Sequence, residues 1–192
     1  MAGLDLVTAP VSEPVTVAQA KARLNIDFGD HDTIIGDMIT ESRSAVEGFL
    51  KQSLLYTVWK HRIDGYFPRE IRLPVGPLRT ATGLSIEYVD DAGATQTLAT
   101  TEYQVSLGST GIIRPAYGKT WPTVRSIMDV VSVTFKSGEA LAADLRPAIL
   151  GALYLEIGNR YANRESIVIG TTTSELSSLS ARNLLTPFVR HD

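Results

Sequence analysis

Residues 14–52 show the spacing of apolar side chains that is typical of helices. Thr16 and Gln19 have the spacing of a capping box, which predicts the start of a short helix. Asp30 or Asp32 is then expected to cap a longer helix, because a carboxylate accepts hydrogen bonds from the first unpaired amides. The apolar stripe expected on that helix consists of Ile34, Ile35, Met38, Ile39, Ala45, Val46, Phe49 and Leu50.

Between residues 54 and 137 the period of the pattern falls to two, as in strands with one buried face. Asp90 to Gly93 supplies turn residues between two of the runs. This part of the chain is therefore expected to form an antiparallel, β-rich insertion. Its inward positions are Trp59, His61 and Ile63; Leu84, Ile86 and Tyr88; Tyr103, Val105 and Leu107; and Val131, Val133 and Phe135.

The helical period returns over residues 144–163, with Asp144 as the expected cap and Pro147 tolerated in the first turn. The apolar side of this helix carries Ile149, Leu150, Leu153, Tyr154, Ile157 and Tyr161. The fold class that follows is α+β: a small bundle of about three main helices with a strand-rich antiparallel insertion and an extended C-terminal tail.

The length of 192 residues fits one domain followed by a tail. We expect the domain over residues 1–165, with helical parts at 14–52 and 144–163 and the β-rich insertion at 54–137. The extended tail is expected over residues 166–192.

The tail combines a polar stretch with an apolar end. Eight of the fifteen residues from 166 to 180 are Ser or Thr. A stretch of this composition can bury too little apolar area to offset the entropy that it loses on ordering. Leu184, Leu185, Phe188 and Val189 then follow close together. Two interpretations remain open: this apolar end folds back on its own domain, or it docks on a neighbouring protein.

Charge and composition exclude several function classes. The chain has 18 basic and 21 acidic residues, a net charge of −3, which argues against a protein that mainly grips phosphate backbones. It has no cysteine, so disulfides, thiolate catalysis and zinc–sulfur sites are excluded. Residues 1–10 lack the pattern of a secretory signal, and the apolar run 147–155 is far shorter than the roughly 20 residues that cross a bilayer.

No catalytic, cofactor-binding or metal-binding residue is expected. Asp90 and Asp91 fit a hairpin corner better than a pair of catalytic carboxylates. Helix capping explains the acidic positions better than a calcium loop, because the glycine and the terminal glutamate of an EF-hand are missing. The acidic positions in question are Asp27, Asp30 and Asp32. The three histidines, His31, His61 and His191, do not have the spacing of metal ligands.

The order of these segments resembles the head–tail connector (adaptor or head-completion) proteins of tailed phages. Residues 14–26, PVTVAQAKARLNI, are similar to the opening A-K-x-x-L helix of that family. Residues 184–190, LLTPFVR, resemble its L-L-x-P-[YF]-R ending, with Val189 inserted. Leu145 to Leu150 fits the family's helix start in part, because the proline is shifted. Features shared with the longer branch of the family are Leu73-Pro74 with Pro77-Leu78, Tyr88 with Asp90 and Gly93, Trp121-Pro122, and Lys136-Ser137-Gly138.

The resemblance implies a structural protein rather than an enzyme, located at the head–tail junction of a virion or virus-like particle, with assembly in the host cytoplasm. It implies a homo-oligomeric ring, expected to be a dodecamer, that joins the portal protein to the stopper or terminator side of the tail. DNA passes through the ring only as cargo, no membrane is involved, and gene transfer agents carry the same kind of adaptor. Portal binding is assigned by the resemblance to Leu184, Leu185, Pro187, Phe188 and Arg190.

Two other function classes stay open at this point. The β-rich region could form a ligand- or glycan-binding module of a phage particle that presents Trp59, Tyr66, Tyr117 and Trp121. The third alternative is a hydrolase that uses an Asp/Glu pair.

Overall fold

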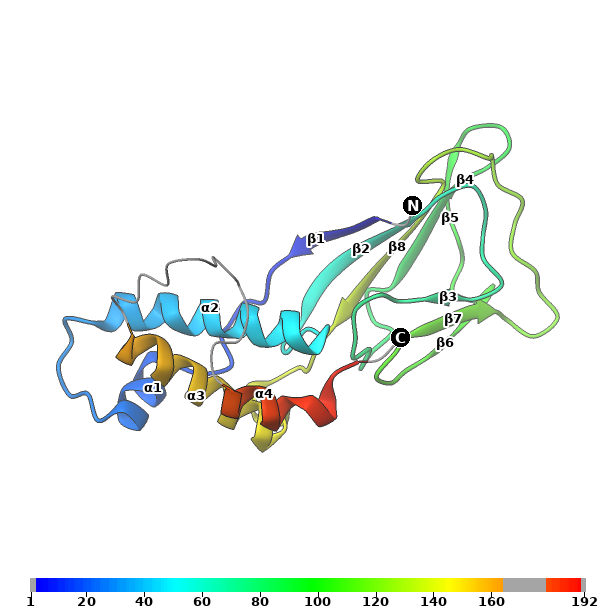
Figure 1. The fold of residues 1–192 in the computed structure, drawn as a ribbon. Helices are drawn as coiled ribbons and strands as arrows, with labels where there is room; N and C mark the ends of the chain where they lie inside the picture. The colour runs from blue at the N-terminus through cyan, green and yellow to red at the C-terminus, as the bar shows by residue number, and fades with distance from the viewer. Residues whose placement is uncertain (1–2, 164–178, 191–192) are drawn as a thin grey trace. The chain divides into compact units, whose positions relative to one another are not determined.

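The computed structural model describes residues 3–163 and 179–190, and these form two compact units. The β unit comprises Met1–Pro10 and Tyr56–Gly138, and the helical unit comprises Val11–Leu55 and Glu139–Asp192. Figure 1 shows that each unit is built from an early and a late stretch of the chain. The described residues contain four α-helices and two antiparallel sheets, which confirms the α+β class.

The helical unit contains the three main helices expected from the sequence. They are α1 (Val17–Leu24), α2 (Asp32–Leu50) and α3 (Pro147–Ala162), with a short 3-10 helix, η1 (Ala142–Asp144), before α3. The apolar positions of α3 face the core as expected, whereas Ile34 of α2 is exposed. The most deeply buried side chains of this core are Ala20, Ile35, Val46, Leu50, Leu153, Ile157 and Leu185.

The helix starts differ from the expectation in two of three cases. The capping box of α1 is confirmed: Thr16 Oγ1 accepts from the Gln19 amide at 3.2 Å, and Gln19 Oε1 accepts from the Thr16 amide at 2.9 Å. The cap of α2 is His31 rather than an aspartate, because the Asp32 carboxylate is drawn to Lys21, 2.6 Å away. Asp144 is the last residue of η1, where its carboxylate accepts from the amide of the N-cap residue Leu141 at 3.3 Å, and Arg146 is the N-cap of α3.

The tail departs from the expected extended form where the structure describes it. Helix α4 (Leu179–Leu185) and the 3-10 helix η2 (Thr186–Phe188) cover most of the apolar end. Burial of Leu185 against the other helices explains the helical form, since an amphipathic helix becomes stable once its apolar side is covered. Of the polar stretch predicted at 166–180, residues 166–178 lie outside the described residues, and the last two belong to α4.

The β unit contains a five-stranded sheet in the order β1-β2-β8-β4-β5 and a three-stranded sheet in the order β3-β7-β6. All neighbouring strands are antiparallel, which confirms the expected antiparallel insertion. Their bounds are β1 (Gly3–Thr8), β2 (Thr57–Ile63), β3 (Ile71–Arg72), β4 (Ser85–Val89), β5 (Thr95–Thr97), β6 (Tyr103–Ser106), β7 (Ile112–Pro115) and β8 (Val131–Ser137).

The core of the β unit uses the alternating positions that the pattern identified. In β8, Val131, Val133 and Phe135 are completely buried, and Ile86 of β4 joins them. Leu107 was expected to face inward, but it follows the last residue of β6 and is exposed.

Strand β1 was not expected from the sequence. It pairs with β2 from Gly3 opposite Arg62 to Leu6 opposite Trp59, and the register shifts between Leu6 and Thr8. Figure 1 shows β1 alongside β2 at one edge of the five-stranded sheet.

Candidate interaction sites

The C-terminal segment, defined here as residues 179–190, packs against its own helical unit. Leu185 is completely buried and Arg190 is nearly so, whereas Leu184 is 40% exposed. Pro187 is exposed and Phe188 is half-buried. Of the two interpretations of the apolar end, the single chain therefore shows the one in which the end folds back. Portal contact stays a prediction.

Two backbone contacts and one ring contact hold the end of this segment. The amide of Arg190 donates to the carbonyl of Leu50 at 3.1 Å, where α2 ends. Gln52 Nε2 donates to the carbonyl of Phe188 at 2.8 Å. The guanidinium of Arg146 lies over the Phe188 ring, 4.9 Å from its centroid, a favourable cation–π arrangement. The segment is thus positioned by both α2 and α3.

A partly buried ion network holds the chain just after α2, next to this contact. Glu47 accepts from the Leu54 amide at 2.8 Å and from Arg43 at 2.7 Å, and Arg43 also donates to Glu13 at 2.7 Å. Burial raises the pKa of Glu47, and the Leu54 amide and Arg43 act in the opposite direction. All four carboxylate oxygens of Glu13 and Glu47 accept hydrogen bonds, so the network holds the connection around Gln52 in place.

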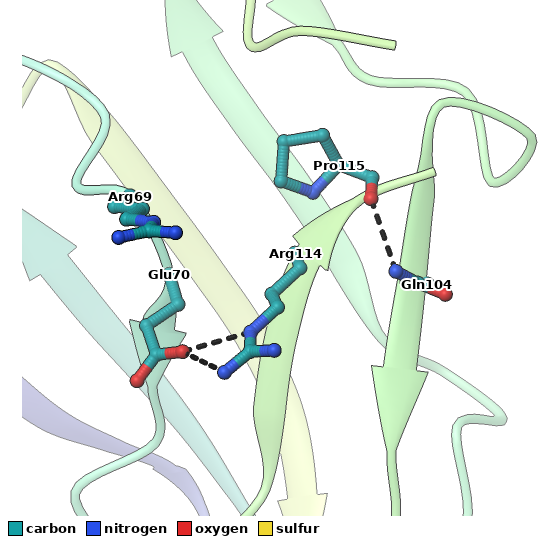
Figure 2. A pocket seen from close by; sticks show the side chains of 5 residues that line it. All are labelled: Arg69, Glu70, Gln104, Arg114 and Pro115. Carbon is teal, nitrogen blue, oxygen red and sulfur yellow. Dashed lines mark hydrogen bonds and ion pairs between the residues drawn. The ribbon is translucent and has the colours of Figure 1, made fainter. Parts of the chain in front are cut away.

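A polar hollow of about 650 Å³ lies on the three-stranded sheet, and Figure 2 shows the residues that line it. Arg114 of β7 reaches Glu70, just before β3, and Arg72 binds the other carboxylate oxygen at 2.6 Å. The hydrogen bonds from Arg114 and Arg72 hold the pKa of Glu70 below its ordinary value. An ionised carboxylate held by two guanidiniums is a poor general base, so Glu70 does not suit the role of a catalytic base.

Asp90 has the structural role at a turn that the sequence predicted. Asp90 accepts from the Ala94 amide and from Gln96, both at 2.9 Å, at the corner between β4 and β5. Hydrogen bonds from Gln96 and then from the Ala94 backbone hold the pKa of Asp90 below its ordinary value. In the ranges 3–163 and 179–190, no group of three or more His, Asp or Glu side chains is placed to hold a metal ion.

The histidines lie far apart in the sequence and have different partners. His31 Nδ1 is 2.8 Å from the Tyr161 hydroxyl, and His61 Nδ1 is 3.1 Å from the Gly3 carbonyl. Burial lowers the pKa of His61, and the contact with the Gly3 carbonyl opposes that shift. His191 lies outside the described residues.

The four aromatic residues considered for ligand binding divide into two pairs. Trp121 stacks on Phe67 with ring centroids 4.8 Å apart, and Trp59 also packs against the core of the β unit. Tyr66 and Tyr117 are exposed. Two of the four rings therefore serve the core, and nothing in the described residues favours a ligand-binding module.

Sequence reasoning missed the cluster around Glu70. The signal was the stretch Arg69-Glu70-Ile71-Arg72, in which charges flank a single apolar residue. The partner Arg114 lies more than forty positions further along the chain, so the pairing of β3 with β7 was needed to reveal the cluster.

None of the helices in the described part of the chain has the length and apolar character needed to cross a membrane.

Comparison with known proteins points to one family and one kind of particle. A family model described as phage gp6-like head-tail connector protein matches residues 14–115. Among curated proteins, no sequence matches the chain.

Three structures of gene transfer agent (GTA) particles contain chains of the same fold. One is the neck of an empty GTA particle computed with C6 symmetry: 17% identity, TM-score 0.78, 99% of this chain and 96% of that chain covered. The virion of a native GTA particle gives 19% identity, a TM-score of 0.77 and coverages of 98% and 96%. For the neck of a native GTA particle computed with C12 symmetry, the identity is 19% and the TM-score is 0.72. The match covers 94% of this chain and 93% of that chain.

Proposed function

The chain belongs to the phage gp6-like head–tail connector family, and we propose that it is the adaptor subunit at the head–tail junction of a tailed phage or gene transfer agent. In this role it forms a ring of twelve copies between the portal and the stopper or terminator side of the tail, and DNA passes through the ring. The observation that carries the proposal is the family match over residues 14–115, together with a fold shared over nearly the whole chain with GTA neck proteins.

The charge of the chain suits a conduit. A net charge of −3 gives DNA little reason to adhere as it slides through, because phosphate binding depends on clustered Lys and Arg. The role is structural, and it requires no turnover of a substrate.

The C-terminal segment is the proposed portal-binding element, with Leu184, Leu185, Pro187, Phe188 and Arg190 as its contact residues. Leu184 and Pro187 are exposed, so they make the first contact. Leu185 and Arg190 are buried in the helical unit and reach the portal only if the segment leaves that unit.

Electron microscopy of the particle tests the location of the chain. We expect density for this fold in a ring directly below the portal. Density for this fold elsewhere in the particle, for example at the tail tip, would overturn the proposed function.

A surface substitution tests the segment better than a deletion of residues 182–192, because the deletion also removes the buried Leu185 from the core. Leu184→Lys should abolish co-purification with the portal while the helical circular dichroism signal and the melting temperature stay unchanged. Asn183→Lys, at the exposed neighbouring position, is the matched control and should bind normally. Normal portal attachment by Leu184→Lys would show that the segment is not the portal-binding element.

A further inference from the structure

One side of helix α2 presents an apolar residue followed by two acidic ones. Ile34 was expected in the buried stripe of this helix but is 42% exposed. Asp37 and Glu41 follow it after three and seven positions, so the three side chains share one side of the helix, called here the α2 face. Departures from the local pattern occur mainly at functional sites, so the exposed isoleucine marks this face as a candidate contact.

The two carboxylates of the α2 face are accessible. Asp37 is exposed and has no ion pair within the described residues. Glu41 pairs with Arg160 at 3.0 Å, and its side chain stays 59% exposed. The face therefore offers two acidic groups beside one apolar side chain.

The outer face of the three-stranded sheet presents the opposite charge around another isoleucine. Directly paired strand residues share a face of a sheet, and Arg72 lies opposite Ile112, which in turn lies opposite Ser106. Arg114 comes two positions after Ile112 in β7 and therefore points to the same side. Ile113, between them, is completely buried, so the side chains of Ile112 and Arg114 are on the outer side of the sheet.

Positive charge exceeds negative charge on this outer face. Arg69 and Arg114 line the hollow in Figure 2 together with Glu70. The single carboxylate of Glu70 meets both Arg114 and Arg72, so three arginines stand against one glutamate. Arg69 is exposed and makes no ion pair in the part of the chain that the structure describes. The surface formed by Arg69, Arg72, Ile112 and Arg114 is called here the arginine face.

The spacing of the charges agrees between the two faces. A helix rises about 1.5 Å per residue, so Asp37 and Glu41 lie about 4.5 Å and about 10.5 Å along α2 from Ile34. A strand rises about 3.3 Å per residue, so Arg114 lies about 7 Å along β7 from Ile112. With the two isoleucines in contact, the two carboxylates lie on either side of the position of Arg114.

We propose that the α2 face of one copy docks on the arginine face of the next copy. Ile34 packs against Ile112, and the two carboxylates of the α2 face lie over the guanidiniums. A second copy is the partner because the matching acidic surface belongs to this chain. The helical unit has thirteen acidic and nine basic residues, whereas the β unit has eight acidic and nine basic residues.

DNA is the poorer partner for the arginine face. Tight binding to a phosphate backbone needs many cationic contacts, and here three arginines surround a carboxylate. The α2 face and the arginine face are different patches, so the contact continues from subunit to subunit and can close into a ring. This contact rests on the proposed ring function and names the surfaces that build it.

An exchange of charges tests the contact. Arg69→Glu and Asp37→Arg each place like charges across it, so each variant should lose the ring at the neck, as seen by electron microscopy. Neither residue makes an ion pair within the described residues, so both variants should keep the wild-type melting temperature. The double variant Arg69→Glu/Asp37→Arg restores opposite charges and should recover the ring.

The matched control for the double variant is Arg69→Glu/Asp91→Arg. It has the same net charge, but the reversed acid is the exposed Asp91 between β4 and β5. This control should not recover the ring. Loss of the ring with Arg69→Glu but not with Asp37→Arg would mean that the arginine face takes another anion, such as DNA phosphate, and would overturn the contact.

The absence of cysteine allows a second test by cross-linking. Ile34→Cys and Ser106→Cys are made as separate single variants and assembled together into particles, and a short bismaleimide then links thiols. Because each chain holds one thiol, a link between the two variants forms only between copies. A covalent dimer is expected in this mixture but not with either variant alone, and not with Val11→Cys in place of Ile34→Cys. Val11 is the control because it is 99% exposed and belongs to the same unit as Ile34.

The outcomes separate this contact from the proposed function. Three results overturn the contact and leave the proposed function standing: rings at the neck with both single charge variants, no recovery in the compensating double variant, or wild-type rings in which the mixed thiol variants give no covalent dimer. Absence of wild-type rings from the neck overturns both.

Discussion

The helical unit and the β unit are each assembled from an early and a late stretch of chain, yet they satisfy their backbone hydrogen bonds in different ways. Helices α1, α2 and α3 pair their backbone groups internally, and the C-terminal segment packs on them through Leu185. The β unit pairs strand with strand and, within the described residues, leaves the outer edges of β1 and β6 open.

Because of this difference, the two units can gain new contacts with other chains in different ways. A helical bundle closes on itself, so new contacts there must use side chains such as Leu184 or displace a packed segment. A sheet with an open edge can accept another strand without losing any bond that it already makes. An open sheet edge can therefore gain a strand at no cost to its existing bonds, whereas the helical unit gains a new contact through exposed side chains or by displacement of a packed segment.

The two units can be followed separately in solution. Both tryptophans, Trp59 and Trp121, belong to the β unit. Tryptophan fluorescence therefore reports unfolding of the β unit, and the helical circular dichroism signal reports mainly on the helical unit.

The largest expected loss of stability comes from weakening the packing of the C-terminal segment on the helical unit. Leu185→Ala removes a completely buried side chain and should lower the free energy of unfolding by about 2–5 kcal/mol. Leu184→Ala, at the exposed neighbour, should cost less than about 1 kcal/mol. Urea unfolding followed by circular dichroism measures both. Equal losses for the two variants would contradict the packing of the C-terminal segment described above.

The next effect concerns the β unit alone. A Cβ at Gly111 would lie 2.7 Å from Leu73 Cδ1 and 2.8 Å from Leu78 Cδ2, both in a fully buried cluster. Gly111→Ala should therefore destabilise the β unit by about 1–3 kcal/mol through overpacking. The midpoint of the fluorescence transition should fall more than that of circular dichroism. Gly29→Ala, where nothing lies within 4 Å of the added atom, is the control and should leave both transitions unchanged.

The smallest effect is a pH dependence confined to the β unit. Burial lowers the pKa of His61 from the ordinary 6.5, so below about pH 6.5 the unfolded chain takes up a proton that the folded chain does not. The stability of the β unit should therefore fall as the pH drops below this value, by at most about 1.4 kcal/mol per pH unit.

The matched variant for this pH effect is His61→Asn, which keeps a donor for the Gly3 carbonyl but does not titrate. Fluorescence-detected unfolding should show a weaker pH dependence for the variant between pH 6.5 and the lower pKa of the folded state. An unchanged slope would show that other groups cause the effect.

Local periodicity was enough to predict most of the elements. The apolar spacing of α2 and α3 and the alternation in β2, β4 and β8 each depend on residues a few positions apart, and the structure confirms them. The capping box at Thr16 is equally local. By contrast, the Asp32 cap was wrong, because Lys21, eleven positions away, pairs with that carboxylate.

The candidate site was predicted less completely than the fold. The apolar residues at 184–189 identified the C-terminal segment in the sequence. They did not predict which residues of the segment would be buried. The open edge of β1 was missed, although Leu4 and Leu6 alternate with Asp5, because its pairing partner β2 begins about fifty residues later.

By itself, the sequence determined the α+β class, the main helices and strands, and the resemblance to head–tail connectors, because these depend on short-range patterns and ordered motifs. Only the tertiary structure decided that Leu185 and Arg190 are buried while Leu184 is exposed, and that β1 and β6 keep open edges. The physical reason is that burial and strand order depend on contacts between residues far apart in the chain, such as Arg190 with Leu50 and Leu6 with Trp59, which local periodicity does not encode.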